Sequence, residues 1–208
     1  MGKLVRAIPI DDEPYPFWNG ADAQQRVAMW LDWLQPSPSI HGTFGAPPRL
    51  NGPSGSWVDD NILQPLGYER ENACITDCLD TYRMSVGVEQ RIRDTYVTAG
   101  LPACYLAPHP SEGDIVREAL THHRGRLLSE LECAYPEIVA TLGNAAARVF
   151  ASIVGLPQSK LSVLDYGEPR RVALRDRTLT WYPLAHPAAP MVYQDAHTKW
   201  VANQKECN

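Results

Sequence analysis

The spacing of apolar residues divides the chain after residue 55 into short apolar runs and longer amphipathic stretches. The short runs have strand length and predict buried β-strands at Asn72–Asp77, Glu137–Leu142 and Thr178–Pro183, with one or two more within Leu161–Leu174. Helices are predicted between them, at Ser56–Leu66, Val88–Thr98, Ser111–Ala134, Ala145–Val154 and Met191–Val201. Strands that alternate with helices indicate a mostly parallel sheet with helices on both faces.

Residues at the ends of these elements support the boundaries. Ser111 is a favourable N-cap for the long helix, and Glu112 and Asp114 suit its first turn. Gly67 is expected to end the helix that starts near Ser56, because glycine readily adopts the left-handed conformation that closes a helix. A turn at Arg175–Arg177 is expected to lead into the strand Thr178–Pro183.

The N-terminal part of the chain has a different character. Apolar residues at helical spacing over Asp22–Leu34 predict one amphipathic helix within an N-terminal extension of residues 1–35. Residues 36–55 are rich in proline, glycine and serine, so they predict a long loop of the kind that often carries function. We expect the 208 residues to form a single domain, 1–208.

Composition narrows the class of protein. The chain is 44% apolar and 21% charged, as expected for a soluble globular domain, and it has no apolar stretch long enough to predict a membrane span. Met1–Ile10 is too short and too polar to be a secretory signal. The five cysteines include no Cys-x-x-Cys pair, which argues against a disulfide framework or a bound metal. We expect a cytoplasmic protein without cofactor.

The formal net charge of −5 argues against a strong nonspecific grip on nucleic acid, which usually requires a basic surplus. A local basic patch remains compatible with that charge. Four arginines precede the last predicted strand, at Arg170, Arg171, Arg175 and Arg177. They supply either such a patch or the solvated side chains of a hairpin.

The strongest candidate for a site is the stretch Thr178–Trp200. A predicted strand ends there in His186-Pro187, followed by further prolines that stiffen the loop, and a helix comes next. The carboxyl ends of parallel strands are where open α/β sheets place their sites. His186 alone is also compatible with a capped strand end.

Three segments together are similar to the motifs of the uracil-DNA glycosylase superfamily, in the family's order. Gly52-Pro53-Ser54-Gly55 with the run ending at Asp77 resembles the family's Gly-x-x-Gly, helix and Ile-Thr-Asn strand. Pro136–Phe150 resembles its strand, Leu-Gly and helix, and Thr178–Pro190 resembles its His-Pro-Ser strand and loop. The resemblance implies a three-layer α/β/α fold with a central, mostly parallel four-stranded sheet, and a monomer that removes a flipped base from duplex or single-stranded DNA.

The resemblance also implies roles for particular residues. His186 is the family's donor to the base carbonyl, which stabilises the negative charge that develops on the leaving base. The family's DNA-binding loops correspond to two sets of residues, Gly52, Ser54 and Gly55 in one and Pro187, Ala188, Ala189 and Met191 in the other. Met191 is the bulkiest apolar candidate to fill the gap left by the flipped nucleotide.

Two departures from the family pattern bear on chemistry. The stretch Gln35–Arg49 lacks the acidic or amide residue that positions the attacking water. Asn51 lies nearest the expected place, beside Leu50, which would contact the base; Asp11, Asp12, Glu13 and Asp32 are further candidates for the water. Asp77 stands where uracil-specific members carry asparagine.

An ionised carboxylate at Asp77 only accepts hydrogen bonds, which suits the exocyclic amine of cytosine. Alternatively, Asp77 caps a helix or binds an arginine such as Arg83. Because removal of ordinary cytosine would damage the host's own DNA, a modified cytosine, such as the hypermodified bases of some bacterial viruses, is the expected substrate. Uracil removal in repair and a catalytically silent DNA-binding module are the alternatives.

The cysteines do not match the iron–sulfur positions of some family branches, where Thr81 and His123 stand instead. No lysine lies near either motif, so we expect a monofunctional enzyme without a lyase step.

Overall fold

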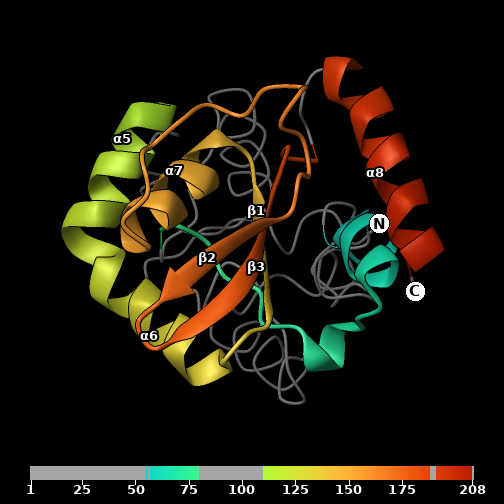
Figure 1. Ribbon diagram of the computed structural model, residues 1–208. Coiled ribbons are helices and arrows are strands. Elements are labelled where there is room, and N and C mark those ends of the chain that lie inside the picture. The colour runs from blue at the N-terminus through green and yellow to red at the C-terminus, as the bar shows by residue number, and fades with distance from the viewer. Residues whose placement is uncertain (1–54, 56, 80–109, 188–190, 208) are drawn as a thin grey trace, which may run out of the picture. The chain divides into compact units, whose positions relative to one another are not determined.

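The computed structural model describes residues 55, 57–79, 110–187 and 191–207 (Figure 1). The chain separates into two compact units, Met1–Ser56 with Asp80–Pro110 and Trp57–Leu79 with Ser111–Asn208. All described residues except Gly55 and Pro110 belong to the second unit. The predicted helices at Asp22–Leu34 and Val88–Thr98, and the loop 36–55 apart from Gly55, lie outside the described residues.

A mixed sheet forms the centre of the second unit. It contains β1 (Ile138–Leu142), β2 (Arg170–Leu174) and β3 (Arg177–Leu184), in the order β1-β3-β2. β1 pairs with β3 in parallel, from Ile138 opposite Thr180 to Leu142 opposite Leu184. β2 pairs with β3 as an antiparallel hairpin (Figure 1). The predicted turn between β2 and β3 is confirmed.

The sheet differs from the expected one in strand number. Three strands lie within the described part of the chain, with one parallel pair, where we expected four mostly parallel strands. The strand predicted at Asn72–Asp77 is wrong, because residues 73–77 have no regular secondary structure. The carbonyls of Asp77 and Cys78 accept hydrogen bonds from the Arg126 guanidinium. A side chain therefore satisfies backbone groups that a neighbouring strand would otherwise satisfy.

The predicted helices in the described part are confirmed, with small shifts in their bounds. Residues 112–134 form one helical run made of α5 (Glu112–Glu118), a π-helical stretch (Ala119–His123) and α6 (Arg124–Ala134). The Ser111 hydroxyl accepts from the Asp114 N–H at 3.2 Å, as expected of an N-cap. The other helices are α7 (Asn144–Ile153) and α8 (Gln194–Cys207), the latter preceded by a 3₁₀ turn (Met191–Tyr193) and longer than predicted.

The helix predicted from Ser56 to Leu66 also forms, with π and 3₁₀ hydrogen bonding over Asp59–Leu63 and Gln64–Leu66. Gly67 ends it in the left-handed conformation, with φ of 78°. Arg70 then pairs with Asp59 at 2.5 Å, which ties the turn after this helix back to it. Ser56 itself lies outside the described residues.

One face of the sheet packs on α7 and α6. Its core joins residues of α7 to residues of the hairpin: Ala147, Phe150, Ala151, Val172, Leu174, Leu179 and Trp181. Leu128 and Leu131 of α6 pack against this core. The indole N–H of Trp181 donates to Thr141 Oγ1 at 2.9 Å, so the largest side chain of β3 is also hydrogen-bonded to β1.

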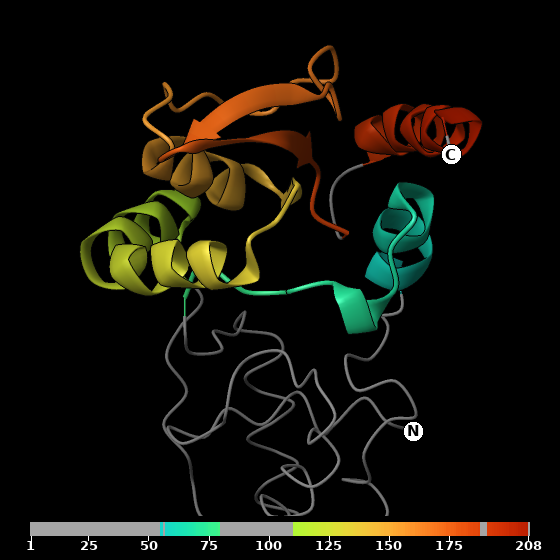
Figure 2. The ribbon, with the colours of Figure 1, turned by 60° about the horizontal axis from the view of Figure 1, so that its bottom comes forward.

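The opposite face of the sheet packs on α8 and the helical residues 57–66. Leu184 and Ala185 at the end of β3 form a core with Ile62, Tyr166 and Trp200. Tyr182 of β3 and Ala140 and Leu142 of β1 pack against the same core. Side chains along β1 and β3 thus alternate between two apolar cores. Helices therefore cover both faces of the sheet, as predicted (Figure 2).

The arginines of the β2–β3 hairpin make contacts within the protein. Arg177 donates to the carbonyls of Pro136 and Leu131 at 3.0 and 2.8 Å. Arg175 pairs with Glu132 at 2.5 Å, and the Arg170 guanidinium lies 5.1 Å from the Trp181 ring centroid. These contacts favour the interpretation of the arginines as side chains that serve the hairpin, over their interpretation as a basic patch.

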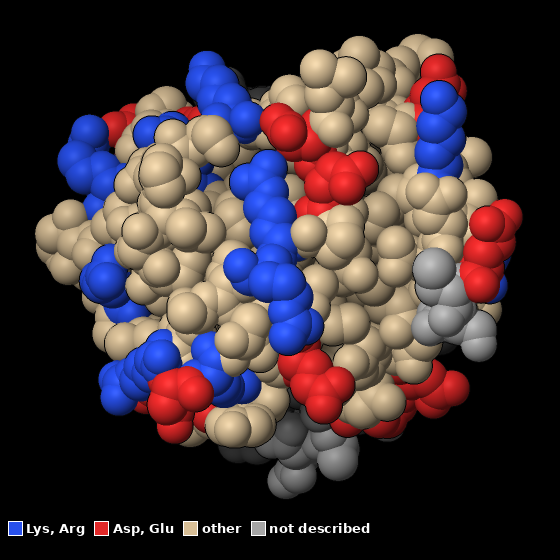
Figure 3. Space-filling view, in the orientation of Figure 1, with Lys and Arg blue, Asp and Glu red and all other residues tan. Residues whose placement is uncertain are grey.

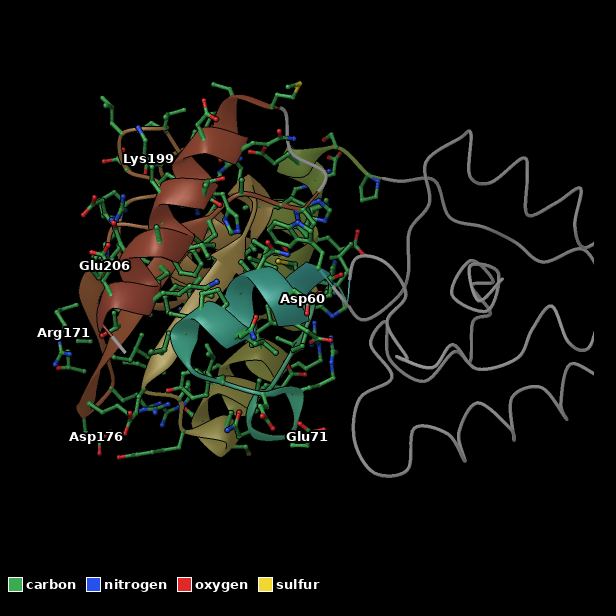
Figure 4. The ribbon with its side chains drawn as sticks, turned by 90° about the vertical axis from the view of Figure 1, so that its right-hand side faces the viewer. Asp60, Glu71, Arg171, Asp176, Lys199 and Glu206 are labelled. Carbon is green, nitrogen blue, oxygen red and sulfur yellow. The ribbon has the colours of Figure 1, made fainter. Side chains whose placement is uncertain are left out.

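Arg171 and Asp176 project outward from this hairpin (Figure 4). Lys and Arg side chains nevertheless form a strip down the face that Figure 1 views, with acidic groups near both ends (Figure 3). In the described part of the chain, no helix is long and apolar enough to cross a membrane.

Gly167 is the glycine whose position leaves the least room for a side chain. Its φ is +64°, its N–H donates to the Pro183 carbonyl at 2.9 Å, and an added Cβ would lie 2.3 Å from Trp200 Cδ1. Trp200 is 4% exposed and cannot easily move aside. This glycine lets α8 pack closely against the turn that follows Leu164.

Gly167→Ala should therefore lower the free energy of unfolding by roughly 2–4 kcal/mol, through overpacking and left-handed strain. Gly125→Ala is the matched control, because nothing lies within 4 Å of an added Cβ there. Alanine inside α6 should raise stability by about 0.5–1 kcal/mol. Urea unfolding followed by tryptophan fluorescence measures both; equal effects would contradict the packing argument.

Candidate active site

The site begins where β1 and β3 end side by side. Because the two strands are parallel and in register, Leu142 and Leu184 reach the same edge of the sheet. The Gly143 N–H donates to the Leu184 carbonyl at 2.7 Å, which extends the pairing one residue beyond the strands. His186 follows two residues later and is exposed. The predicted placement of His186 at the carboxyl end of a parallel strand is confirmed.

Gly143 allows His186 to approach the β1–α7 connection closely. Its φ is +95°, and a Cβ added to it would lie 3.3 Å from the Cβ of His186. Any other residue would be strained in this conformation and would also press on the histidine. The glycine of the Leu142-Gly143 pair, which resembled a family motif, is thus needed for the backbone conformation beside His186.

Asp77 is brought close to His186. The charge of His186 lowers the pKa of the Asp77 carboxyl, so the two groups lie within electrostatic range of each other. They are more than a hundred residues apart in the chain, and both are exposed. The two residues that sequence analysis singled out for base removal therefore lie within electrostatic range of each other.

Opposing effects act on the Asp77 carboxyl. Desolvation is the largest of them and raises its pKa above the ordinary value. The Cys78 N–H, which donates to Asp77 Oδ1 at 2.7 Å, lowers the pKa, as do His186, Arg126 and the Leu79 N–H in decreasing order. Although the side chain keeps an accessible surface, protein around the carboxyl removes enough hydration for the neutral form to gain on balance.

Arg126 of α6 holds the backbone around Asp77. Its guanidinium donates to Thr76 Oγ1 at 3.1 Å and to the carbonyls of Asp77 and Cys78 at 2.9 and 3.2 Å. The same group pairs with Glu130 at 2.8 Å. Leu79, two residues after Asp77, is 5% exposed in a core with residues of α5, α6 and α7. Asp77 is thereby fixed from the side of α6.

Tyr166 contacts the backbone next to His186, as Arg126 contacts the backbone around Asp77. Its hydroxyl lies 2.6 Å from His197 Nδ1 of α8, and an interaction with the Ala185 backbone N–H lowers its pKa. Burial outweighs this interaction and raises the pKa of Tyr166 to about 12. The hydroxyl therefore stays protonated and can donate to His197 Nδ1, while it also interacts with the N–H of Ala185, the residue before His186.

His197 is suited to accept this hydrogen bond because burial lowers its pKa and so favours the neutral ring. The Asn61 carbonyl acts in the opposite direction. Nevertheless, Nε2 makes no hydrogen bond of normal geometry within the described part of the chain, so we regard its contact with Asn61 as weak. Tyr166 thus links α8 to the end of β3 mainly through Nδ1.

The remaining predicted site residues divide into those described and those outside the described part. Gly55 is buried, Pro187 is partly buried, and Met191 is 77% exposed, as suits a side chain that inserts into DNA. Residues outside the described part are Leu50, Asn51, Gly52, Ser54, Ala188 and Ala189. Their assigned roles stay predictions. Among the described residues, no group of three or more His, Cys, Asp or Glu side chains could hold a metal ion.

Sequence analysis missed Arg126 and Tyr166. Arg126 lies in the middle of a charged helix, and Tyr166 lies in a loop between two elements, so neither carries a recognisable motif. Their contacts reach across 49 and 31 residues of chain, to Asp77 and His197 respectively. No local pattern could have indicated them.

The pKa of Asp77 predicts a pH-dependent gain in stability for Asp77→Asn. Because the folded-state pKa is raised, the wild type loses stability as pH rises from the ordinary aspartate pKa through the folded-state value. The amide introduced by this substitution does not ionise, so the variant should be more stable than wild type above this window and lose that advantage below it. Thermal melts over a pH series measure the difference.

Asp114→Asn is the control with the opposite sign. Hydrogen bonds from Ser111 and Arg117 lower the pKa of the Asp114 carboxyl, so its ionised form stabilises the fold. This variant should be less stable than wild type at neutral pH, and the difference should vanish as pH falls through the lowered pKa. The same sign for both variants would contradict the assignment at Asp77.

Tyr166→Phe should lower the free energy of unfolding by about 1–3 kcal/mol, because it leaves the partly buried His197 Nδ1 without its partner. Tyr135→Phe is a suitable control, since the Tyr135 side chain is 69% exposed. Its effect should stay within about 0.5 kcal/mol. Urea unfolding compares the two; a Tyr166→Phe effect no larger than the control would rule out the link.

Comparisons with known proteins identify the family of the chain. A search of curated proteins finds no match to the chain. The family model described as the uracil DNA glycosylase superfamily matches residues 50–205, which include both Asp77 and His186. Members of that superfamily are DNA glycosylases, and the matched range begins near the Gly52 at which the resemblance starts. The chain therefore belongs to the uracil DNA glycosylase superfamily.

Proposed function

We propose that the chain is a monofunctional DNA glycosylase that removes a cytosine-like base from DNA, acting as a monomer in the cytoplasm. The N-glycosidic bond breaks and the base leaves with the bonding electrons, water adds to C1′ of the flipped nucleotide, and the proton that the water loses ends on the released base. The observation that carries the proposal is that Asp77 lies within electrostatic range of His186, which follows the carboxyl end of β3. A group that can read a base is therefore near a group that can stabilise the departure of that base.

His186 supplies the electrostatic part of this reaction. The leaving base carries negative charge that reaches its carbonyl oxygen, and a donor already held in place stabilises that charge in the transition state. Gly143 and the Leu184–Gly143 hydrogen bond restrict the backbone around His186, and Tyr166 holds Ala185. A preorganised donor needs such restraint, because reorganisation during the reaction would offset its benefit.

Asp77 recognises the base by hydrogen bonding. Oδ1 accepts from the Cys78 N–H, which leaves Oδ2 as the oxygen with more capacity for a base. An ionised Oδ2 accepts from the exocyclic amine of cytosine, whereas the carbonyl O4 of uracil offers it no donor at that position. Superfamily membership by itself supports the reaction class and not this substrate.

The raised pKa of Asp77 favours a second candidate, uracil. A protonated carboxyl can donate to O4, as the amide of asparagine does. The charges on His186 and Arg126 and the backbone N–H groups favour ionisation, whereas desolvation opposes it. Release of a cytosine-like base should therefore rise as pH increases through the Asp77 pKa, and release of uracil should fall over the same range.

A modified cytosine is the preferred substrate within this class. An enzyme that excised ordinary cytosine would damage the DNA of its own cell, whereas a modified base marks foreign DNA such as that of some bacterial viruses. The loop 36–55 is the expected place for a pocket that accepts the added group, and Asn51 is our candidate to position water. Removal of the base of an infecting genome would make this an antiviral activity.

The test is a base-release assay on matched oligonucleotides and viral DNAs that contain uracil, cytosine, hydroxymethylcytosine or glucosylated hydroxymethylcytosine, with abasic sites read by alkaline cleavage. We expect release from a modified cytosine. His186→Ala should reduce kcat by about 10²–10³-fold, because it removes a transition-state donor. Asp77→Asn should shift the preference towards uracil, because the amide donates to O4.

Asp176→Asn is the matched control, since Asp176 projects outward from the hairpin (Figure 4) and should leave all rates unchanged. Release of uracil alone by the wild type would overturn the substrate assignment and indicate a repair enzyme. No release from any substrate, together with binding of the same DNAs, would instead indicate a catalytically silent binding module.

A further inference from the structure

Arg126 is placed to control the residue that we propose reads the base. It belongs to α6, whereas Asp77 belongs to a segment without secondary structure. Two guanidinium nitrogens contact three consecutive residues, with Nη1 on Thr76 Oγ1 and Nη2 on the carbonyls of Asp77 and Cys78. The contacts surround the backbone of Asp77 without engaging its carboxyl by a hydrogen bond that the structure shows.

The guanidinium group suits this task for a geometric reason. Its five N–H donors lie in one plane and point in fixed directions, so one side chain can serve several acceptors at once. A lysine ammonium at the same place would keep the charge but could not reproduce the arrangement of donors. Glu130 occupies a further direction at 2.8 Å, one helical turn from Arg126, and so orients the side chain.

The carbonyls involved would otherwise lack regular partners. Residues 73–77 have no secondary structure, so within the described part of the chain no strand supplies the N–H groups for them. Leu79 is buried against α5, α6 and α7 and secures only the end of the segment. Without Arg126, the peptide groups on both sides of Cys78 could rotate, and the Asp77 carboxyl would move with them.

Arg126 also acts on the charge of Asp77. It lowers the pKa of the carboxyl, in the same direction as His186 and the N–H groups of Cys78 and Leu79, and against desolvation. Position and ionisation of Asp77 therefore depend on the same side chain. A carboxylate that accepts a hydrogen bond from the amine of a base must be both correctly placed and ionised.

We propose that Arg126 is a positioning residue that holds Asp77 in place through its hydrogen bonds to residues 76–78, and thereby sets the choice between a cytosine-like base and uracil. This inference rests on the proposed function for its effect on substrate choice. Its effect on Asp77 itself does not depend on activity. The two can therefore fail separately.

The first measurement uses the full chain and no substrate. Carboxyl NMR titration gives the pKa of Asp77, and amide hydrogen exchange gives the protection of the Cys78 N–H, in wild type, Arg126→Met, Arg126→Lys and Arg124→Met. Arg126→Met should raise the Asp77 pKa further and speed exchange at Cys78, because both charge and donors are lost. Arg126→Lys should keep the pKa near wild type but still speed exchange, because only the donor geometry is lost.

Arg124→Met is the matched control. Arg124 lies on the same helix and donates to the Ser152 carbonyl of α7 at 3.3 Å, whereas the hydrogen bonds to residues 76–78 come from Arg126. It should leave the Asp77 pKa and the Cys78 exchange rate unchanged. Unchanged values in both Arg126 variants would overturn the inference, whatever the enzyme acts on. If Arg126→Met does not fold, Arg126→Lys still decides the geometric part, and its melting temperature reports the fold.

The second measurement uses the base-release assay. Arg126→Met should lower kcat/KM for the cytosine-like substrate by on the order of 10- to 100-fold, as expected when a contacting group is displaced, and uracil should be affected less. The pH profile for the cytosine-like substrate should move to higher pH. Equal losses on both bases with an unmoved profile would show a purely structural role. If wild type releases no base, the proposed function fails, and the titration and exchange data still test Arg126.

Discussion

The parallel pairing of β1 with β3 is the constraint on which the site depends. Parallel strands end at the same edge of a sheet, so the residues after Leu142 and after Leu184 emerge side by side. The Gly143 hydrogen bond continues this pairing, and the absence of a Cβ at Gly143 makes room for His186. The histidine is therefore placed by backbone hydrogen bonds and by the two apolar cores that hold the strands.

Asp77 is held near His186 by different means. Its segment is held by the burial of Leu79 at one end and by the Arg126 guanidinium along its backbone. Backbone groups in a sheet are held by many equivalent bonds, whereas this segment depends on a few particular side chains. The position of Asp77, our proposed base reader, is consequently more sensitive to single substitutions than the position of His186.

The electrostatics of the site follow from this arrangement. Desolvation favours a neutral Asp77, and His186, Arg126 and two backbone N–H groups favour the ionised form. Small changes in any of them shift the balance, and with it the hydrogen bonds that the carboxyl can offer. Membership of the superfamily supports the class of reaction, while under the proposed function the protonation state of this one carboxyl sets which base it can bind.

Local sequence patterns were sufficient for most of the secondary structure in the described part of the chain. The N-cap at Ser111, the helix end at Gly67 and the strands around Val139 and Trp181 follow from short-range rules of hydrogen bonding and apolar spacing. The strand predicted at Asn72–Asp77 was wrong for a physical reason. An apolar run becomes a strand only if a neighbouring strand pairs with it, and here Arg126 takes that role.

The sequence by itself therefore determined the family, the order of most elements and the identities of His186 and Asp77, because these depend on residue types at short spacing. Only the tertiary structure decided that the two residues lie within electrostatic range of each other, that the Asp77 pKa is raised, and that Arg126 and Tyr166 contact the segments that carry them. Those features arise from contacts between residues tens of positions apart, and from burial, which no local pattern encodes.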